Sequence, residues 1–358
     1  MLTGFMKGRG DKRLAELAEL SACLGSEPLL VQGSTGNTSV KTGRVLWIKA
    51  SGKWLANATN EDMFVPVPLG DAEQFLALSS PAYVTLPDSS GLTPSIETAM
   101  HLVLPHRIVI HLHSVNTIAW AVQENGPSYL RQRLNGLPWC WIPYTSSGAP
   151  LARAMRASLR FSPDVFILAN HGLVIGAETC GQAAALLADI EARLAIEPRE
   201  TPEPKRAALG RLASTDYQLP TSDLIHSLAT NPLSTAVVSG GILYPCQAMF
   251  LGRSMCVVSE GTFVGHAVHD YYLRNGERPP ALLVEGSGVL VAKDLTATEA
   301  EVLDGLAQVV RRLPQNARVQ YLSDRRIDEV LNSNVYAGVQ SRPPGKAEPP
   351  LRSKAAAQ

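Results

Sequence analysis

The stretch Arg107-Ile-Val-Ile-His-Leu-His-Ser114 decides how the rest of the sequence is interpreted. Its apolar run predicts a buried β-strand, and side chains alternate across a strand, so His111 and His113 share one face. Two imidazoles one residue apart on a rigid strand can bind the same metal ion. A further ligand must then come from another segment of the chain.

A second apolar run, Val165-Phe-Ile-Leu-Ala169, ends in Asn170-His171-Gly172. Because glycine lets the backbone turn sharply, this strand end can present His171 as the third imidazole. Neutral imidazoles suit zinc, and three protein ligands with one open position are typical of a catalytic site. The spacing alone leaves an alternative open, in which the strand histidines are core residues and His171 is a turn residue.

The composition describes an ordinary globular protein and excludes several classes of partner. Among 358 residues, 45% are hydrophobic, and 32 basic residues balance 32 acidic ones. A net charge near zero gives no reason to expect nucleic acid. We find neither a signal peptide nor an apolar run of the roughly 18 residues that a membrane span needs. The five scattered cysteines form no CxxC pair, which excludes a cysteine-based zinc site and predicts a cytoplasmic protein with reduced thiols.

Glu97 is the candidate carboxylate of the site. The run Thr93-Pro-Ser-Ile-Glu97 predicts a helix start, with Thr93 as N-cap and Pro94 at the first helical position. Glu97 would then lie in the first turn, and His101 one turn later on the same face. We interpret His101 as a partly buried helix residue without a role in the chemistry.

The loop from Gly33 to Ser39 is rich in glycine and small hydroxyl residues. Such loops leave backbone N–H groups free to point at an anion, and side-chain hydroxyls can add donors. The chain has neither a Walker motif nor GxGxxG. Taken alone, a loop of this kind is more often a tight turn than a phosphate site.

Five motifs in this order give the chain a resemblance to a known family. The sequence resembles the class II aldolase/adducin family over about residues 10 to 195. The motifs are Gly-Asn-Thr-Ser (Gly36 to Ser39), Lys-Ala-Ser-Gly (Lys49 to Gly52), Pro-Ser-x-Glu-x-x-x-His (Pro94 to His101), His-x-His (His111 to His113) and Asn-His-Gly-Leu (Asn170 to Leu173).

The resemblance implies a role for each candidate residue. Zinc, or another divalent metal, would be held by His111, His113 and His171, and Glu97 would approach the metal and act as general base. Some members also use a catalytic tyrosine from a neighbouring subunit, for which Tyr129 and Tyr144 are the candidates here. Ile96 stands where those aldolases often have a second serine. The substrate phosphate would be held by Ser34, Gly36, Asn37, Ser51, Gly52 and Ser95.

The resemblance also implies a fold and an activity. The fold would be α/β, with a mainly antiparallel central sheet flanked by helices, assembled as a homotetramer with active sites at subunit interfaces. The activity would be zinc-dependent retro-aldol cleavage of a phosphorylated ketose to dihydroxyacetone phosphate and an aldehyde. The alternatives are a sugar-acid phosphate decarboxylase, and a pentulose-phosphate 4-epimerase, which typically has Asp where this chain has Glu97. A non-enzyme alternative is an adducin-like interaction module, which lacks the metal histidines.

The second half reads as a separate portion. We predict a catalytic domain over residues 1–195, a Pro-rich connection, a second α/β domain over 207–340 and a disordered tail over 341–358. Strands are expected near Ala236–Val238, Ala248–Leu251 and Met255–Val258, and a capping box at Thr296 and Glu299 predicts a helix.

Two features of this second portion relate it to other sequences. Phe166–Ile175 resembles Leu282–Val291, which suggests a degenerate repeat with Ser287 in place of His171. The segment Tyr244–Gly252 resembles a Tyr-Pro-Asp-His-Val-Val-Phe-Leu-Gly segment of bacterial rhamnulose-phosphate aldolase-type proteins with a fused dehydrogenase. Here Cys246 and Gln247 replace Asp and His.

Overall fold

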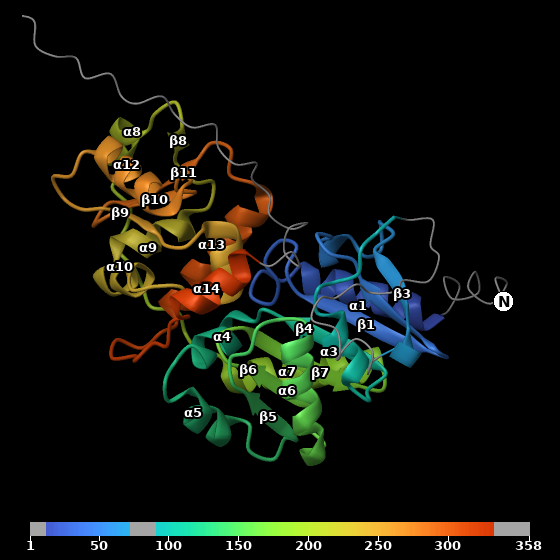
Figure 1. Ribbon diagram of the computed structural model, residues 1–358. Coiled ribbons are helices and arrows are strands. Elements are labelled where there is room, and N and C mark those ends of the chain that lie inside the picture. Colours follow the sequence, from blue (N-terminus) through green and yellow to red (C-terminus); the bar gives the residue numbers. More distant parts are fainter. Residues whose placement is uncertain (1–11, 72–90, 333–358) are drawn as a thin grey trace, which may run out of the picture.

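A computed structural model describes residues 12–71 and 91–332, and the tail expected at 341–358 lies outside these residues (Figure 1). The described chain contains a seven-stranded sheet, in the order β3-β2-β1-β4-β7-β6-β5, and a four-stranded sheet, in the order β8-β11-β10-β9. The strands of the first sheet are β1 (Asn37–Thr42), β2 (Val45–Lys49), β3 (Phe64–Pro68), β4 (Ile108–Leu112), β5 (Trp139–Ile142), β6 (Val165–Leu168) and β7 (Gly172–Ala177).

Strand β4 lies at the centre of the first sheet, as its apolar run predicted. It pairs antiparallel with β1 on one side and β7 on the other, and only β5 and β6 run parallel. The register sets Asn37 opposite His111 and Leu173 opposite Leu112. The expected α/β fold with a mainly antiparallel sheet is therefore confirmed.

Helices cover both faces of this sheet. Residues Ile110 and Leu112 face the core shared with α1 (Lys12–Gly25) and α7 (Cys180–Leu194). The opposite face, which carries Val109 and therefore His111, packs against α3 (Thr98–Val103) and α6 (Ala149–Ser158). Helices α4 (Val115–Ala121) and α5 (Gly126–Arg133) follow β4.

Helix α3 begins later than the sequence predicted. Residues 93–95 run extended beside the end of β2, where Ser51 N donates to Thr93 O (2.8 Å) and Ser95 N donates to Lys49 O (3.0 Å). These cross-strand hydrogen bonds outweigh the local helix signal, so the helix starts at Thr98 and Glu97 becomes its N-cap residue. The change brings Ser95 and Glu97 beside the Lys49–Gly52 loop.

The second portion contains the smaller sheet and the remaining helices. Two predicted strands, near Ala236–Val238 and Ala248–Leu251, are wrong, because these residues form helices α10 (Pro232–Ser239) and α11 (Pro245–Leu251). Each helix has proline in its first turn, and short apolar runs fit a buried helix as well as a strand. The other elements are α8 (Arg206–Leu212), β8 (Tyr217–Gln218), α9 (Ser227–Thr230), β9 (Cys256–Val258), α12 (Val264–Asn275), β10 (Ala281–Val284), β11 (Gly288–Ala292), α13 (Ala297–Arg311) and α14 (Asp324–Leu331).

The four-stranded sheet has the topology of the β4-β7-β6-β5 half of the larger sheet, as a degenerate repeat requires. In each, a parallel strand pair (β5 with β6, β9 with β10) leads into an antiparallel hairpin and a helix with a capping box. The hairpins have the same register, since Leu168 pairs with Gly172 and Val284 pairs with Gly288. The turn of the second hairpin therefore ends in Ser287, at the place that His171 occupies in the first.

The two portions share a hydrophobic core. Val115, Ile118 and Val122, in and just after α4, pack in one cluster with Leu303 and Leu306 of α13. Figure 1 shows α13 and α14 on the side of the second portion that faces α4. Within the described residues, we find no helix with the length and apolarity needed to cross a membrane.

Candidate active site

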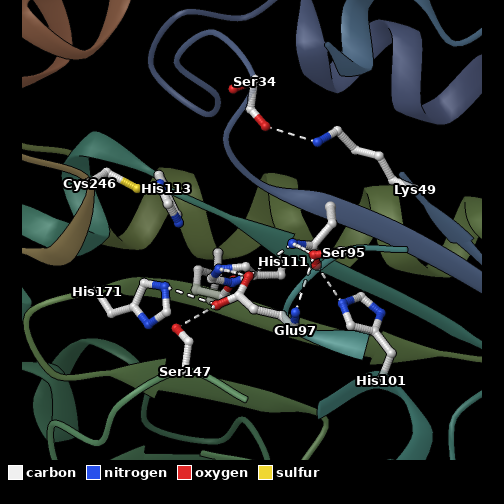
Figure 2. Close-up of polar contacts among 12 residues, drawn as sticks. Ser34, Lys49, Ser95, Glu97, His101, His111, His113, Ser147, His171 and Cys246 are labelled. Carbon is white, nitrogen blue, oxygen red and sulfur yellow. Dashed lines mark hydrogen bonds and ion pairs between the residues drawn. The ribbon is translucent and has the colours of Figure 1, made fainter. Parts of the chain in front are cut away.

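Three buried histidines converge where β4 ends and β7 begins (Figure 2). The ring centroids of His111, His113 and His171 lie 4.9 to 5.3 Å apart, and one nitrogen from each lies within 4.8 Å of the others. These are the three residues that the sequence singled out as metal ligands. A group with this spacing could bind a metal.

The hydrogen bonds of the histidines fit a metal site. Nδ1 of His111 lies 3.0 Å from Leu173 O and donates to it, which leaves the lone pair of Nε2 free. Nε2 of His111 and Nε2 of His113 are buried and make no hydrogen bond. Burial lowers the pKa of both residues, although Glu97 opposes the shift, and this direction favours the neutral imidazole that metal binding requires.

Two backbone features place His171 against β4. Asn170 has φ 51°, a left-handed conformation that asparagine tolerates, and it turns the chain out of β6. Two residues after Asn170, a Cβ on Gly172 would lie 2.4 Å from Leu112 O. Only glycine therefore lets the hairpin approach β4 closely enough to bring His171 to the other two histidines.

The carboxylate of Glu97 lies between two of the histidines. Oε2 is 3.2 Å from Nε2 of His111, and Oε1 is 3.2 Å from Nε2 of His171. Asn37 Nδ2 donates to Oε2 (2.8 Å), and Ser147 Oγ donates to Oε1 (3.3 Å). Burial alone would raise the pKa of Glu97, but the neighbouring histidines hold it well below its ordinary value. The structure therefore presents an ionised carboxylate at the histidine cluster.

His101 has a larger part in this arrangement than the sequence suggested. It is fully buried, and its Nε2 donates to Asn37 Oδ1 (2.5 Å) while its Nδ1 accepts from Ser39 Oγ (2.7 Å). Burial lowers the pKa of His101 to about 3, so it stays neutral. By binding the oxygen of the Asn37 amide, His101 directs the amide N–H groups toward Glu97 and Ser95.

All residues expected to hold phosphate line a single pocket beside the histidines. The backbone N–H groups of Ser51 and Ser95 already donate to Thr93 O and Lys49 O. Their hydroxyl groups are therefore what these two residues can offer a ligand. Phosphate binding itself stays a prediction. The residues are Ser34, Gly36, Asn37, Ser51, Gly52 and Ser95.

Lys49 is a pocket residue to which the sequence analysis gave no role. It is 2% exposed, and its Nζ donates to Ser34 O (2.8 Å) at the mouth of the predicted phosphate loop. Burial lowers its pKa to about 7, although Glu97 and Cys246 oppose the shift. The sequence did contain one signal of this burial. Lys49 ends the apolar run that begins at Val45, and a lysine at the end of a buried strand lies within the core or at the edge of the core.

The apolar part of the pocket wall comes largely from the second portion. Ile96 is joined there by Pro245, Met249 and Phe250 of α11. Cys246, on the same helix, lies with Sγ 3.5 Å from Nδ1 of His113. Nothing in the spacing of the sequence predicted this contact, because 133 positions separate the two residues.

The two candidate tyrosines have different surroundings. Tyr129 is 40% exposed, packs its ring at a tilted angle against Trp120 and lines a different cavity, with Pro314 and Arg318. Tyr144 packs against the same hydrophobic cluster as Ile96 and Met249, two residues of the pocket wall, and its buried hydroxyl has no hydrogen-bond partner among the described residues. Tyr144 is therefore the nearer of the two to the site. A tyrosine from another subunit, and the tetramer it implies, stay predictions.

Comparison with known protein families identifies the family of this chain. The model of the class II aldolase and adducin N-terminal domain matches residues 15–197, about half of the chain. The chain belongs to the class II aldolase and adducin family. Membership supports an enzyme, and the class II aldolases are metal-dependent, in keeping with the buried histidine group.

Individual relatives of this family member are distant. The uncharacterized oxidoreductase YuxG of Bacillus subtilis is 30% identical over 186 residues, which are 47% of this chain and 27% of YuxG. The N-terminal class II aldolase domain of a conserved Thermoplasma acidophilum protein is 26% identical with a TM-score of 0.45, over 51% of this chain and 92% of that one. The L-fuculose-1-phosphate aldolase of Thermus thermophilus is 20% identical with a TM-score of 0.36, over 51% and 91%. The chain thus spans about a quarter of its curated relative.

Proposed function

We propose that this protein is a zinc-dependent carbon–carbon lyase. It would cleave a phosphorylated ketose by a retro-aldol reaction to dihydroxyacetone phosphate and an aldehyde. The observation that carries the proposal is the Glu97 carboxylate, 3.2 Å from Nε2 of both His111 and His171, in a pocket whose lining also includes Lys49. A base, a group of histidines that could bind a metal and a buried lysine thus lie at one cavity.

The histidines would hold the metal through their Nε2 nitrogens. Nε2 of His111 and Nε2 of His113 are buried without a hydrogen bond, and Nε2 of His171 faces the same point beside Glu97. A zinc ion held there supplies a fixed positive charge opposite the negative charge that develops on the substrate oxygens during cleavage.

The chain's own groups then have separate tasks. Glu97, ionised and hydrogen-bonded by Asn37 and Ser147, is placed to exchange the proton on the carbon that loses its bond. Lys49 and the hydroxyls of Ser51 and Ser95 are placed to bind the phosphate and so hold the substrate in register. These contacts fix which end of the ketose enters first.

The apolar wall favours a particular kind of aldehyde. Ile96, Met249 and Phe250 offer no hydrogen-bond donor or acceptor from their side chains, and they line the same pocket as the polar residues. A product aldehyde with an apolar end would bury that end here, whereas a polyhydroxylated one would lose hydrogen bonds to water. We propose that short aldehydes with an apolar end are preferred.

The test is a screen of phosphorylated ketoses with zinc-loaded, full-length protein. We expect aldehyde and dihydroxyacetone phosphate in equal amounts, loss of activity on chelation, and recovery on addition of zinc. His111→Ala should abolish both zinc binding and cleavage, whereas His269→Ala, an exposed histidine on α12, should change neither.

The same screen separates the alternatives. Release of carbon dioxide from a sugar-acid phosphate would identify a decarboxylase, and a change of configuration without aldehyde release would identify an epimerase. Protein that holds no stoichiometric divalent metal would favour the adducin-like interaction module and overturn the proposal.

A further inference from the structure

We propose that Cys246 is a positioning residue for His113, through which the second portion of the chain helps to shape the metal site. The inference rests on the proposed metal site. Cys246 Sγ lies 3.5 Å from Nδ1 of His113, and both side chains are buried (Figure 2). No other side-chain hydrogen bond to His113 is found among the described residues.

The direction of this hydrogen bond follows from the metal site. If His113 binds a metal through Nε2, which has no hydrogen-bond partner, its proton must be on Nδ1. Nδ1–H then donates, and the sulfur of Cys246 accepts. Hydrogen bonds of this kind fix the tautomer and the ring orientation of a ligand histidine, and removing them typically weakens metal binding about 10- to 100-fold.

His111 shows the same principle within the first portion. Its Nδ1 donates to Leu173 O, a backbone group of the strand next to its own. His113 lies one residue beyond the paired register of β4 with β7, which ends at Leu112, and among the described residues no strand carbonyl accepts from its ring. The second portion therefore provides for His113 what the sheet provides for His111.

Helix α11 is anchored so that Cys246 reaches this point. The backbone N–H of Leu243 donates to Gln247 Oε1 (2.8 Å), and the backbone O of Leu243 accepts from Asn170 Nδ2 (2.9 Å). Asn170 is the neighbour of His171. The segment that begins α11 is thus tied to the turn that carries one ligand, while Cys246 contacts another.

The experiment measures zinc affinity, by competition with a chelator of known affinity, in the full-length protein and three variants. Cys246→Ala should weaken zinc binding by about 10-fold or more, because Nδ1 loses its acceptor. Cys246→Ser should recover most of the affinity, because the hydroxyl oxygen can accept. Cys256→Ala, which removes another buried thiol of the second portion, should match the wild type.

Replacement of zinc by cobalt distinguishes a positioning residue from a ligand. The wild-type cobalt protein should lack the strong near-ultraviolet absorption of a thiolate bound to cobalt. Such a band, lost in Cys246→Ser, would make Cys246 a direct ligand and overturn the inference. Equal zinc affinity in Cys246→Ala and the wild type would overturn it while leaving the metal site intact. Wild-type protein without stoichiometric zinc would overturn both proposals.

Discussion

Asn37 Nδ2 donates to Oε2 of Glu97 across 2.8 Å, from a residue that lies opposite His111 in the sheet. The amide is held in this orientation from behind by His101, whose Nε2 donates to Asn37 Oδ1. Hydrogen bonds from His101 to Asn37 and from Asn37 to Glu97 thus hold the carboxylate against the histidine cluster. Because every member is buried, water cannot replace a lost partner without structural change.

Glu97→Gln should keep the metal site and lose the base. The amide has the size of the carboxylate but cannot take up a proton, so kcat should fall about 10²- to 10⁴-fold at unchanged zinc content. Glu178→Gln, at the other end of the sheet, is the control and should behave as the wild type. Substantial activity in Glu97→Gln would show that another group is the base.

His101→Phe should act through Asn37. The substitution fills the space but removes the donor to Asn37 Oδ1 and the acceptor for Ser39 Oγ, so the free energy of unfolding should fall by about 1–3 kcal/mol. A misoriented amide should also lower kcat, by up to about 100-fold, with zinc retained. Chemical denaturation and steady-state kinetics measure the two effects. Unchanged kcat in a folded variant would contradict this role.

Phosphate binding should depend on pH through Lys49. Its pKa is lowered from 10.5 to about 7, so its positive charge is present below pH 7 and is lost as the pH rises above it. A phosphate monoester gains its second charge near pH 6, so affinity should be greatest at about pH 6–7 and then decline. The Kd of a non-cleavable ketose phosphate, measured from pH 5 to 9, tests this.

Lys49→Met separates the two titrations. The variant should bind the phosphate more weakly and should lose only the decline above pH 7. Lys293→Met, an exposed lysine of the second portion, should keep the wild-type profile. If the alkaline decline persists in Lys49→Met, a different group is responsible.

Asn170→Gly should destabilise the contact between the two portions. Glycine adopts the φ of 51° without strain, so the substitution tests the side chain alone. Its Nδ2 donates to Leu243 O and Gln320 O, and both carbonyls would lose this donor. The free energy of unfolding should fall by about 1–3 kcal/mol, measured in urea. Asn125→Gly, at an exposed N-cap without a side-chain hydrogen bond, should cause a smaller fall.

The central strand and the three histidines could be predicted because strand alternation and a turn glycine are local signals. The failures have two causes: local helix signals that were overlooked, and contacts with partners distant in the sequence. The apolar residues of α10 and α11 looked like strands, although Pro232 and Pro245 marked helix starts. Thr93 and Pro94 looked like a helix start because the backbone of Lys49 and Ser51, which holds them extended, lies far away in sequence.

The site residues that were not predicted also depend on partners distant in the sequence. Lys49, Ser147 and Cys246 come from a strand end, a loop and a helix of different portions, and their contacts exist only after the chain has folded. Lys49 belongs to the Lys-Ala-Ser-Gly motif, but its burial could not be known without the segments that cover it.

The shared core of α4 and α13 has a consequence for the order of events during synthesis. Val115, Ile118 and Val122 can pack with their own half soon after translation, but their buried surface includes residues of α13 that are made nearly 200 positions later. A nascent chain that has only its first portion outside the ribosome exposes this apolar face, and it lacks the contacts of Leu243 with Asn170 and of Cys246 with His113. Completion of the pocket at the histidine cluster is thereby coupled to synthesis of the polypeptide through Gln320, whose carbonyl accepts a hydrogen bond from Asn170.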